Sequence, residues 1–370
     1  MKKRIIAAVL AGMLIVSAGG CGNGTASSGN AVDNSNGMAT ESSAGQAIAS
    51  ARQDENADAD TKEGGVTALS LMQEVNTGDE QIIDDNYRTW YEVFVYSFFD
   101  SDGDGIGDLN GLTEKLDYIN DGDPATDTDL GCNGIWLMPV MPSTTYHKYD
   151  VTDYCDIDPE YGTMDDFKNL IAACHERGIN VIIDLVMNHT SSQHEWFKKA
   201  LQDIEGEYGD YFYFRKGKNG QPPCNYRSYF GGSAWEKVKG TDYYYLHLFA
   251  KEQPDLNWYN PKVKEELYSM INWWLDKGLA GFRIDAIINI RKDLQFKSLP
   301  ADGDDGFVHA GVAAEKVPGI GDMLEDLKKN TFEKYDAFTV AEVFNMRKDE
   351  LREFIGGNGH FSTMFDFSAE

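Results

Sequence analysis

Two short segments each place an acidic residue near the end of an apolar, strand-like run. The segment GFRIDA at residues 281–286 contains Arg283 and Asp285, and TVAEV at residues 339–343 contains Glu342. Residues two apart on a strand face the same way, so Arg283 can hold Asp285 ionised and oriented. Burial raises a carboxyl pKa, as a proton donor requires, and Glu342 lies in a buried-looking strand. Each signal taken singly also fits a structural role, such as a plain ion pair.

A third segment, DLVMNH at residues 184–189, leaves another apolar run with polar side chains. Polar groups at the carboxyl end of a barrel strand are candidates for an active-site rim. A single buried His such as His189 is more often a hydrogen-bonded core residue. This segment therefore indicates an active site only in combination with the other two segments.

An acidic loop, DSDGDGIGD at residues 100–108, has the spacing by which Ca²⁺ gathers oxygen ligands. The expected ligands are Asp100, Asp102, Asp104, the carbonyl of Ile106 and Asp108. Gly111 stands where an EF-hand has a bidentate Glu, so a calcium loop of another kind is predicted. The alternative is a solvated acidic turn, which the mutual repulsion of its carboxylates disfavours.

Strand-like runs alternate with helical patterns from about Ile82 onward. The expected strands are 92–99, 135–138, 180–186, 281–284, 338–343 and 363–367. The expected helices are 112–119, 164–177, 262–277, 320–330 and 348–354. Several strands are nearly continuous apolar runs, as in parallel sheets covered on both faces. This alternation predicts an α/β fold, either a β/α barrel or a doubly wound sheet.

Together and in this order, the segments resemble the α-amylase superfamily of glycoside hydrolases, glycoside hydrolase family 13. QPDLN at residues 253–257 and YHKYD at residues 146–150 are similar to further family segments. The resemblance implies a (β/α)₈ TIM barrel, with residues 188–253 as a subdomain inserted after the third strand. It also implies a nucleophile at Asp285 and a general acid/base at Glu342. Substrate binding is implied for Tyr149, His189, Arg283 and Asp150, with Asp150 steadying the region of Arg283.

The resemblance is incomplete at the end of the chain. The family has a third essential Asp, in a motif with His after the seventh strand, and no such motif occurs before Glu370. About six β/α units are expected, over residues 82–187 and 254–370. A barrel lacking two strands cannot close. We therefore expect a C-terminally truncated chain that is itself inactive.

The N-terminal residues have the features of an export signal. Three basic residues precede the apolar run 5–16, whose twelve residues at about 1.5 Å each are too short for a roughly 30 Å membrane core. A signal peptide over residues 1–20 is predicted, with Cys21 lipidated or, alternatively, simple secretion. Residues 21–81 are rich in small and polar residues and predict a flexible tether to the membrane.

The formal net charge of −28, from 33 basic and 61 acidic residues, argues against nucleic-acid binding. A negative net charge suits an extracellular enzyme that acts on an uncharged substrate such as an α-glucan. Ca²⁺ is the expected cofactor, as the acidic loop indicates. Ala286, directly after Asp285, favours α-1,4 bonds in starch or maltooligosaccharides. The alternatives are an α-glucosidase, oligo-1,6-glucosidase or transglycosylase of the same family. A non-catalytic carbohydrate-binding protein on the same scaffold, or a purely calcium-binding structural module, would be of another class. Oligomeric state and disulfide pairing are left open.

Overall fold

The computed structural model describes residues 85–344, 346–365 and 367. The predicted signal peptide, Cys21 and the tether up to residue 81 lie outside these residues. Among the described residues, no helix combines the length and apolar character that crossing a bilayer requires. The four cysteines in this part of the chain, at positions 132, 155, 174 and 224, are unpaired.

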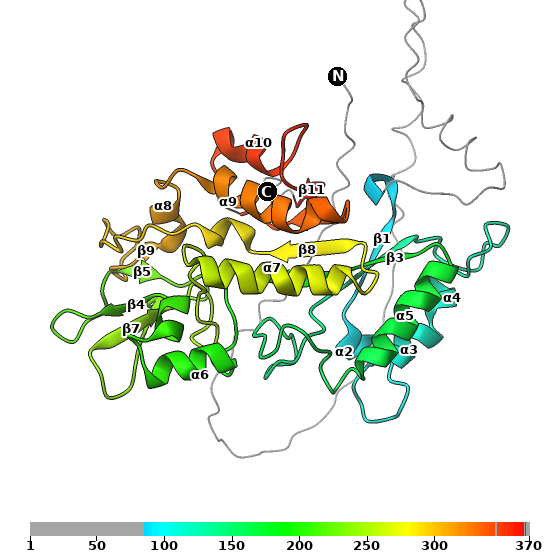
Figure 1. Ribbon diagram of the computed structural model, residues 1–370, viewed down its shortest axis with the longest axis horizontal. Coiled ribbons are helices and arrows are strands. Elements are labelled where there is room, and N and C mark those ends of the chain that lie inside the picture. The colour runs from blue at the N-terminus through cyan, green and yellow to red at the C-terminus, as the bar shows by residue number, and fades with distance from the viewer. Residues whose placement is uncertain (1–84, 345, 366, 368–370) are drawn as a thin grey trace, which may run out of the picture. The chain divides into compact units, whose positions relative to one another are not determined.

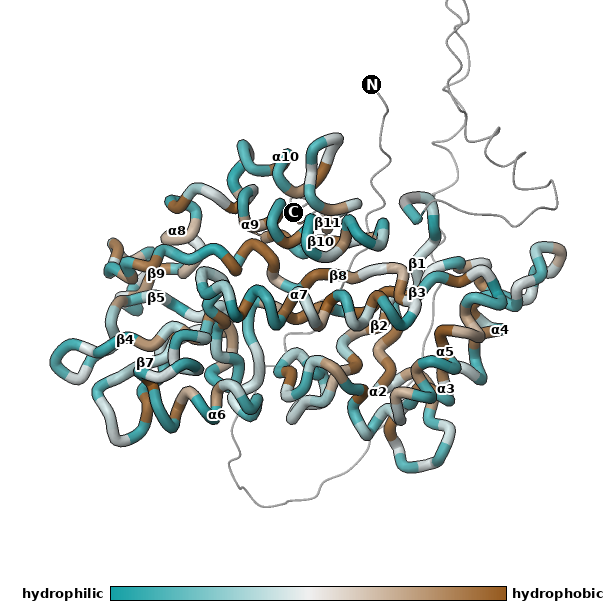
Figure 2. Tube along the Cα trace, in the orientation of Figure 1, coloured by the Kyte–Doolittle hydropathy of each residue, from teal (hydrophilic) through white to brown (hydrophobic). Residues whose placement is uncertain are grey.

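Within the described residues, six strands form one parallel sheet in the order β1-β2-β3-β8-β10-β11 (Figure 1). The strands are β1 (Trp90–Val93), β2 (Gly134–Leu137), β3 (Asn180–Val186), β8 (Gly281–Asp285), β10 (Phe338–Ala341) and β11 (Thr363–Met364). The two central strands, β3 and β8, are almost entirely buried, and Figure 2 shows brown, hydrophobic stretches among the strands of the sheet. This confirms the expected parallel sheet with both faces covered.

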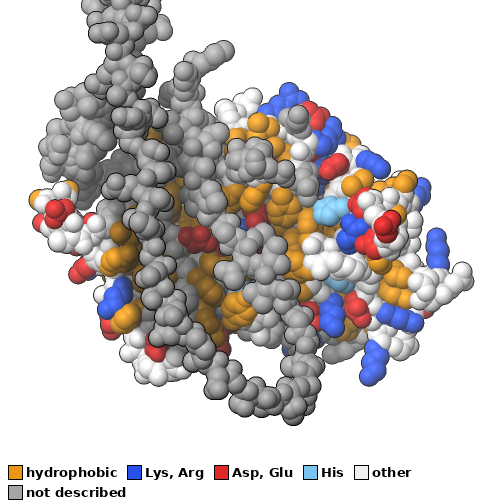
Figure 3. All heavy atoms as spheres, turned by 180° about the vertical axis from the view of Figure 1, so that it is seen from behind, with side chains coloured by type: hydrophobic (Ala, Val, Ile, Leu, Met, Phe, Trp, Pro, Cys, Tyr) orange, Lys and Arg blue, Asp and Glu red, His pale blue; other side chains and the backbone are white. Residues whose placement is uncertain are grey.

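The sheet curls on itself. The ring of Trp90 on β1 stacks on that of Phe338 on β10, with centroids 4.9 Å apart, although three strands separate β1 from β10 in the sheet. These two rings pack with Trp136 and Ile182 in an apolar cluster inside the curl. A flat sheet would hold the two strands far apart, given about 4.8 Å between neighbours. The fold is therefore an incomplete (β/α)₈ barrel. From behind, hydrophobic side chains gather at the centre of the visible face (Figure 3).

Helices connect the strands, as parallel pairing requires. They are α2 (Val95–Phe98), α3 (Leu109–Glu114), α4 (Leu116–Ile119), α5 (Met164–Glu176), α7 (Pro261–Leu275), α9 (Ile320–Asn330) and α10 (Leu351–Phe354), with single turns η1 (Asp85–Tyr87), η4 (Phe332–Lys334) and η5 (Lys348–Glu350). Thr163 caps α5 with a reciprocal capping box, and Asn260 caps α7 before Pro261. The rings of Phe167 on α5 and Trp274 on α7 meet edge to face.

Several sequence-based boundaries were wrong: the strands expected at 338–343 and 363–367 end earlier, at Ala341 and Met364, and two differences near the start of the domain have a clear cause. The first strand ends at Val93, because the backbone carbonyls of Tyr96 and Phe99 accept from the acidic loop instead of pairing with β2. The helix expected at 112–119 begins three residues earlier, because the side chain of Asp108 caps it, and it breaks at Lys115.

The segment between β3 and α7 folds around a small antiparallel sheet of order β4-β7-β6. Its elements are α6 (Glu195–Gln202), η2 (Glu207–Tyr211), β4 (Phe214–Lys216), β5 (Tyr226–Arg227), β6 (Trp235–Lys237) and β7 (Tyr243–Leu246). A second excursion follows β8, with η3 (Ile287–Ile290), β9 (Val308–His309) and α8 (Ala310–Ala314). β9 pairs with β5, and Arg227 binds both Asp302 and Asp305. The sequence analysis did not anticipate this second excursion.

Candidate active site

Polar side chains meet at the carboxyl ends of three neighbouring strands. Asp184 lies on β3, Arg283 and Asp285 lie on β8, and Glu342 directly follows β10. The strand register sets Arg283 opposite Asp184 on one side and opposite Val340 on the other. Parallel strands end at the same edge of a sheet, so residues far apart in sequence share one rim.

Arg283 is the centre of this group. Its Nη1 atom lies 2.6 Å from Asp184 Oδ1 and 2.8 Å from Asp285 Oδ1, and its Nη2 atom lies 2.8 Å from Glu342 Oε1. All four side chains are buried. One guanidinium thus orients three carboxyl groups by charge-assisted hydrogen bonds. The aromatic rings of Trp136, Tyr149 and Phe365 surround it, and this apolar setting strengthens those interactions.

Asp285 and Glu342 are both bonded to the guanidinium of Arg283, and each carboxyl group affects the pKa of the other. The backbone N–H of Ala286 also donates to Glu342 Oε2 at 3.0 Å. Ala286 can do this because it is left-handed, with φ 46° and ψ 35°, which is uncommon for a residue other than glycine. Ala286, a strained residue directly after Asp285, therefore helps to hold the Glu342 side chain beside Asp285.

Burial shifts the proton affinity of both groups. It raises the pKa of Glu342 to about 7, and this outweighs the opposing effect of Arg283. Burial also raises the pKa of Asp285, again against Arg283. Because Glu342 holds its proton more tightly, the pair can exist near neutral pH as a protonated Glu342 beside an ionised Asp285. One protonated and one ionised carboxyl group is the arrangement that acid-assisted displacement needs.

Tyr149 and His189 lie beside these carboxyl groups. The hydroxyl of Tyr149 donates to Asp184 Oδ2 at 2.9 Å. His189 is buried, with Nδ1 3.2 Å from Asn188 Nδ2 and Nε2 3.0 Å from the Tyr149 carbonyl oxygen. Burial lowers the pKa of His189 to about 4, so the imidazole is neutral in ordinary conditions. Gln253, from the inserted segment, donates to the same carbonyl oxygen at 3.0 Å.

Asp150, which the resemblance implies to steady the region of Arg283, is itself held by a cluster of hydroxyl groups. Its carboxylate accepts from Ser143 at 2.6 Å and from Thr144 and Thr145. The pKa of Asp150 lies below its ordinary value. Burial acts to raise it, but the hydrogen bonds from the three hydroxyl groups outweigh this effect. The residue that holds Arg283 from the opposite side is Asp184, to which the sequence analysis gave no role. The signal available in the sequence was that Asp184 is an acidic residue within an otherwise mostly apolar, strand-like run.

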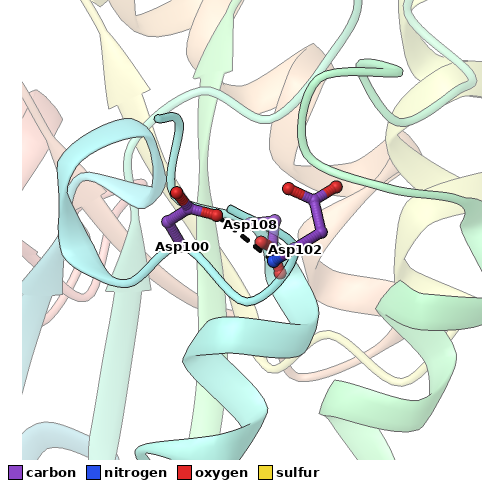
Figure 4. Close-up of side chains that lie close together, drawn as sticks. All are labelled: Asp100, Asp102 and Asp108. Carbon is purple, nitrogen blue, oxygen red and sulfur yellow. Dashed lines mark hydrogen bonds between the residues drawn. The ribbon is translucent and has the colours of Figure 1, made fainter. Parts of the chain in front are cut away.

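The acidic loop brings three of its expected ligands together. One carboxylate oxygen from each of Asp100, Asp102 and Asp108 lies within 4.8 Å of the others (Figure 4). Backbone N–H groups of Gly105 and Gly103 lower the pKa of Asp100, which favours its ionised form. Three carboxylates within reach of one point fit a hard divalent cation.

Asp104 lies outside this group, because its carboxylate turns back to accept from the backbone N–H of Ile106 at 2.7 Å. The five-ligand set expected from the spacing is thus brought together only in part. Asp108 also caps α3, and its carboxylate accepts from Gly111 N–H at 2.7 Å. The loop is therefore fixed to the start of α3.

Comparisons with known proteins agree with this geometry. Residues 92–369 match the family described as alpha amylase, catalytic domain. The chain is 43% identical over 279 residues to the probable oligo-1,6-glucosidase 3 of Bacillus subtilis strain 168, covering 75% of this chain and 49% of that protein. It is 40% identical over 261 residues to the trehalose-6-phosphate hydrolase of the same organism, covering 70% of this chain and 44% of that protein.

Among solved structures, the trehalulose synthase of Pseudomonas mesoacidophila MX-45 superposes with a TM-score of 0.69 at 41% identity, covering 75% of this chain and 48% of that one. The chain spans about half the length of the curated relatives it matches. The match runs through the strands that carry Asp184, Arg283, Asp285 and Glu342. This chain belongs to the α-amylase family, glycoside hydrolase family 13, and matches its catalytic domain.

Proposed function

We propose that the protein to which this chain belongs is a retaining α-glucosidase that acts on short α-glucosides. The observation that carries this proposal is the buried pair of Asp285 and Glu342, each 2.8 Å from the guanidinium of Arg283. Retaining glycosidases hold their two carboxyl groups closer together than inverting ones, which leave room for a water molecule. Attachment of both carboxyl groups to one guanidinium supports the close, retaining geometry.

In the proposed mechanism, an Asp285 oxygen attacks the anomeric carbon of the glucosyl residue. Glu342 gives its proton to the glycosidic oxygen, and the bond from that oxygen to the anomeric carbon breaks. Glu342 then takes a proton from a water molecule that attacks the same carbon, and the bond to Asp285 breaks. Arg283 keeps Asp285 oriented, while His189 and Tyr149 line the sugar pocket.

The substrate size follows from the relatives rather than from the catalytic pair. They are named as oligo-1,6-glucosidases, an α-glucosidase and a trehalose-6-phosphate hydrolase, and related structures hold isomaltulose or sucrose. These names support the alternative of an α-glucosidase or oligo-1,6-glucosidase over the starch-directed amylase that the sequence analysis favoured. Ala286 supports α-1,4 bonds as the second candidate. Export and lipid attachment at Cys21 stay sequence-based predictions.

Substrate preference tests the proposed function. In the protein with its complete catalytic domain, kcat/KM should be higher for maltose and isomaltose than for soluble starch, because the pocket is proposed to accept short chains. Initial rates of glucose release measure this. A preference for starch would restore the amylase interpretation. No turnover of any α-glucoside by the complete protein would favour a non-catalytic binding role.

Glu342→Gln tests the role of the proton donor. The substitution keeps the shape and removes the acidic proton, so turnover of maltose should fall by about 10²- to 10⁴-fold. Nitrophenyl α-glucoside has a leaving group that departs without protonation, so formation of the glycosyl–enzyme intermediate from it should fall much less. A nitrophenol burst in rapid-mixing experiments measures that step. Equal losses on the two substrates would show that Glu342 does not act as the acid.

The pH dependence of kcat/KM follows from the same pair. Activity should fall as pH rises through about 7, because burial raises the pKa of Glu342 to about 7 and the acid must be protonated. It should also fall on the acid side once Asp285 is protonated. Burial raises the pKa of Asp285, so this limb should lie above the pH at which an exposed Asp titrates. A profile that stays level through pH 7 and beyond would contradict the assignment of Glu342.

A calcium ion is proposed at Asp100, Asp102 and Asp108, where it would stabilise the loop before α3. Added Ca²⁺ at 100 times its dissociation constant should raise the free energy of unfolding by about 2.7 kcal/mol. Thermal melting with Ca²⁺ and with a chelator measures the shift. Asp102→Asn should abolish it, while the matched control Asp104→Asn should retain it. If calcium changes no melting temperature in the unmodified protein, the loop is a solvated turn.

A further inference from the structure

A buried lysine lies behind the site without touching its carboxyl groups. Lys292 follows η3 in the second excursion and is only 5% exposed. Its ammonium lies 2.8 Å from Asp255 Oδ2, donates to Asn188 Oδ1 at 2.9 Å, and donates to the carbonyl of Asn289. A buried ammonium needs such oxygen partners to offset its lost hydration. Lys292 therefore connects three parts of the chain, which are the end of β3, the segment between β3 and α7, and the second excursion after β8.

The ammonium determines the orientation of the Asn188 side chain. It has three donors and no acceptor, so the atom of Asn188 that faces it must be the amide oxygen. The amide nitrogen then faces His189, with Nδ2 3.2 Å from Nδ1. An amide nitrogen only donates, so Nδ1 of His189 must be an unprotonated acceptor. A neutral imidazole carries one proton, which is then on Nε2.

The surroundings of Nε2 do not make this choice by themselves. The Tyr149 carbonyl oxygen, 3.0 Å away, favours a proton on Nε2. The Gln253 side-chain nitrogen, 3.1 Å away, favours a lone pair there. The two neighbours pull in opposite directions, so the contact on the Nδ1 side decides the tautomer. Burial lowers the pKa of His189 to about 4, so the choice lies between two neutral forms.

We propose that Lys292 is a positioning residue that, through Asn188, fixes His189 with its proton on Nε2. The imidazole then presents an N–H rather than a lone pair toward Tyr149 and Gln253. If the site has the proposed function, this N–H faces a sugar hydroxyl, and that consequence rests on the proposed function. The tautomer of His189 does not depend on the proposed function, and it can be measured without turnover of a substrate.

Nitrogen NMR of the 370-residue chain labelled with ¹⁵N in its histidine rings tests this at neutral pH. The chain has seven histidines, and loss of one signal set in His189→Gln assigns His189. In the unmodified chain, Nδ1 of His189 should resonate as unprotonated and Nε2 as protonated. Lys292→Met frees the Asn188 amide to turn, and signal should move toward the form protonated on Nδ1. Asn188→Asp should complete that shift, because a carboxylate only accepts.

Arg291→Met is the matched control. Arg291 is the preceding residue in the same loop and equally buried, but it pairs with Glu350. Arg291→Met also removes a buried cation, but it should leave the His189 signals unchanged. A change of these signals in Arg291→Met would therefore indicate a general loss of packing. Asn188→Asp keeps the cation at Lys292 and decides the matter if Lys292→Met does not fold. The proposal is overturned if Nδ1 is protonated in the unmodified chain, or if the tautomer survives Asn188→Asp or a folded Lys292→Met.

Discussion

One buried guanidinium facing three buried carboxyl groups is the interaction on which the site depends. Arg283 contacts Asp184, Asp285 and Glu342, and a single positive charge cannot offset three negative ones in an apolar setting. The group with the least favourable ionisation keeps its proton. Glu342 is that group, because burial raises its pKa to about 7 and the neighbouring Asp285 raises it further. The charge imbalance thus favours retention of a proton in this group, and burial assigns the most tightly held proton to Glu342.

The barrel is what makes this arrangement possible. β3, β8 and β10 are neighbours in the sheet but come from widely separated parts of the chain. Their parallel direction sets Asp184, Arg283 and Glu342 at one rim, and alternation along β8 turns Arg283 and Asp285 to the same side. The strained Ala286 then closes the group by donating to Glu342. Apart from the pair of Arg283 and Asp285 on β8, these contacts cross between strands, so local structure alone could not form the site.

A second buried cation extends this arrangement outward. Lys292 joins Asn188 after β3 to Asp255 of the inserted segment, while β5 and β9 join that segment to the second excursion. The wall of the site is therefore built by two excursions that hold each other. The carboxyl groups stand on the strands of the sheet or directly after them, whereas His189 stands where the segment between β3 and α7 leaves the sheet and Tyr149 lies in the loop between β2 and α5.

The sequence by itself determined the parallel α/β architecture and the candidate catalytic residues. Apolar runs with period-specific spacing, and acidic residues at their ends, are local features that survive without tertiary information. Helix starts were equally local, since Thr163 and Asn260 cap through bonds to residues two or three positions away. The tertiary structure alone decided which carboxyl groups share Arg283, that Asp150 binds hydroxyl groups instead, and that Asp104 turns away from the acidic cluster. It also decided the partners of Lys292 and the pairing of β5 with β9. The sharing of Arg283, the bond from Lys292 to Asn188 and the pairing of β5 with β9 depend on contacts between residues 59 to 104 positions apart, which fold geometry sets and local spacing does not encode. Asp150 and Asp104 bind residues only two to seven positions away, so there the backbone conformation of a loop decided the partners.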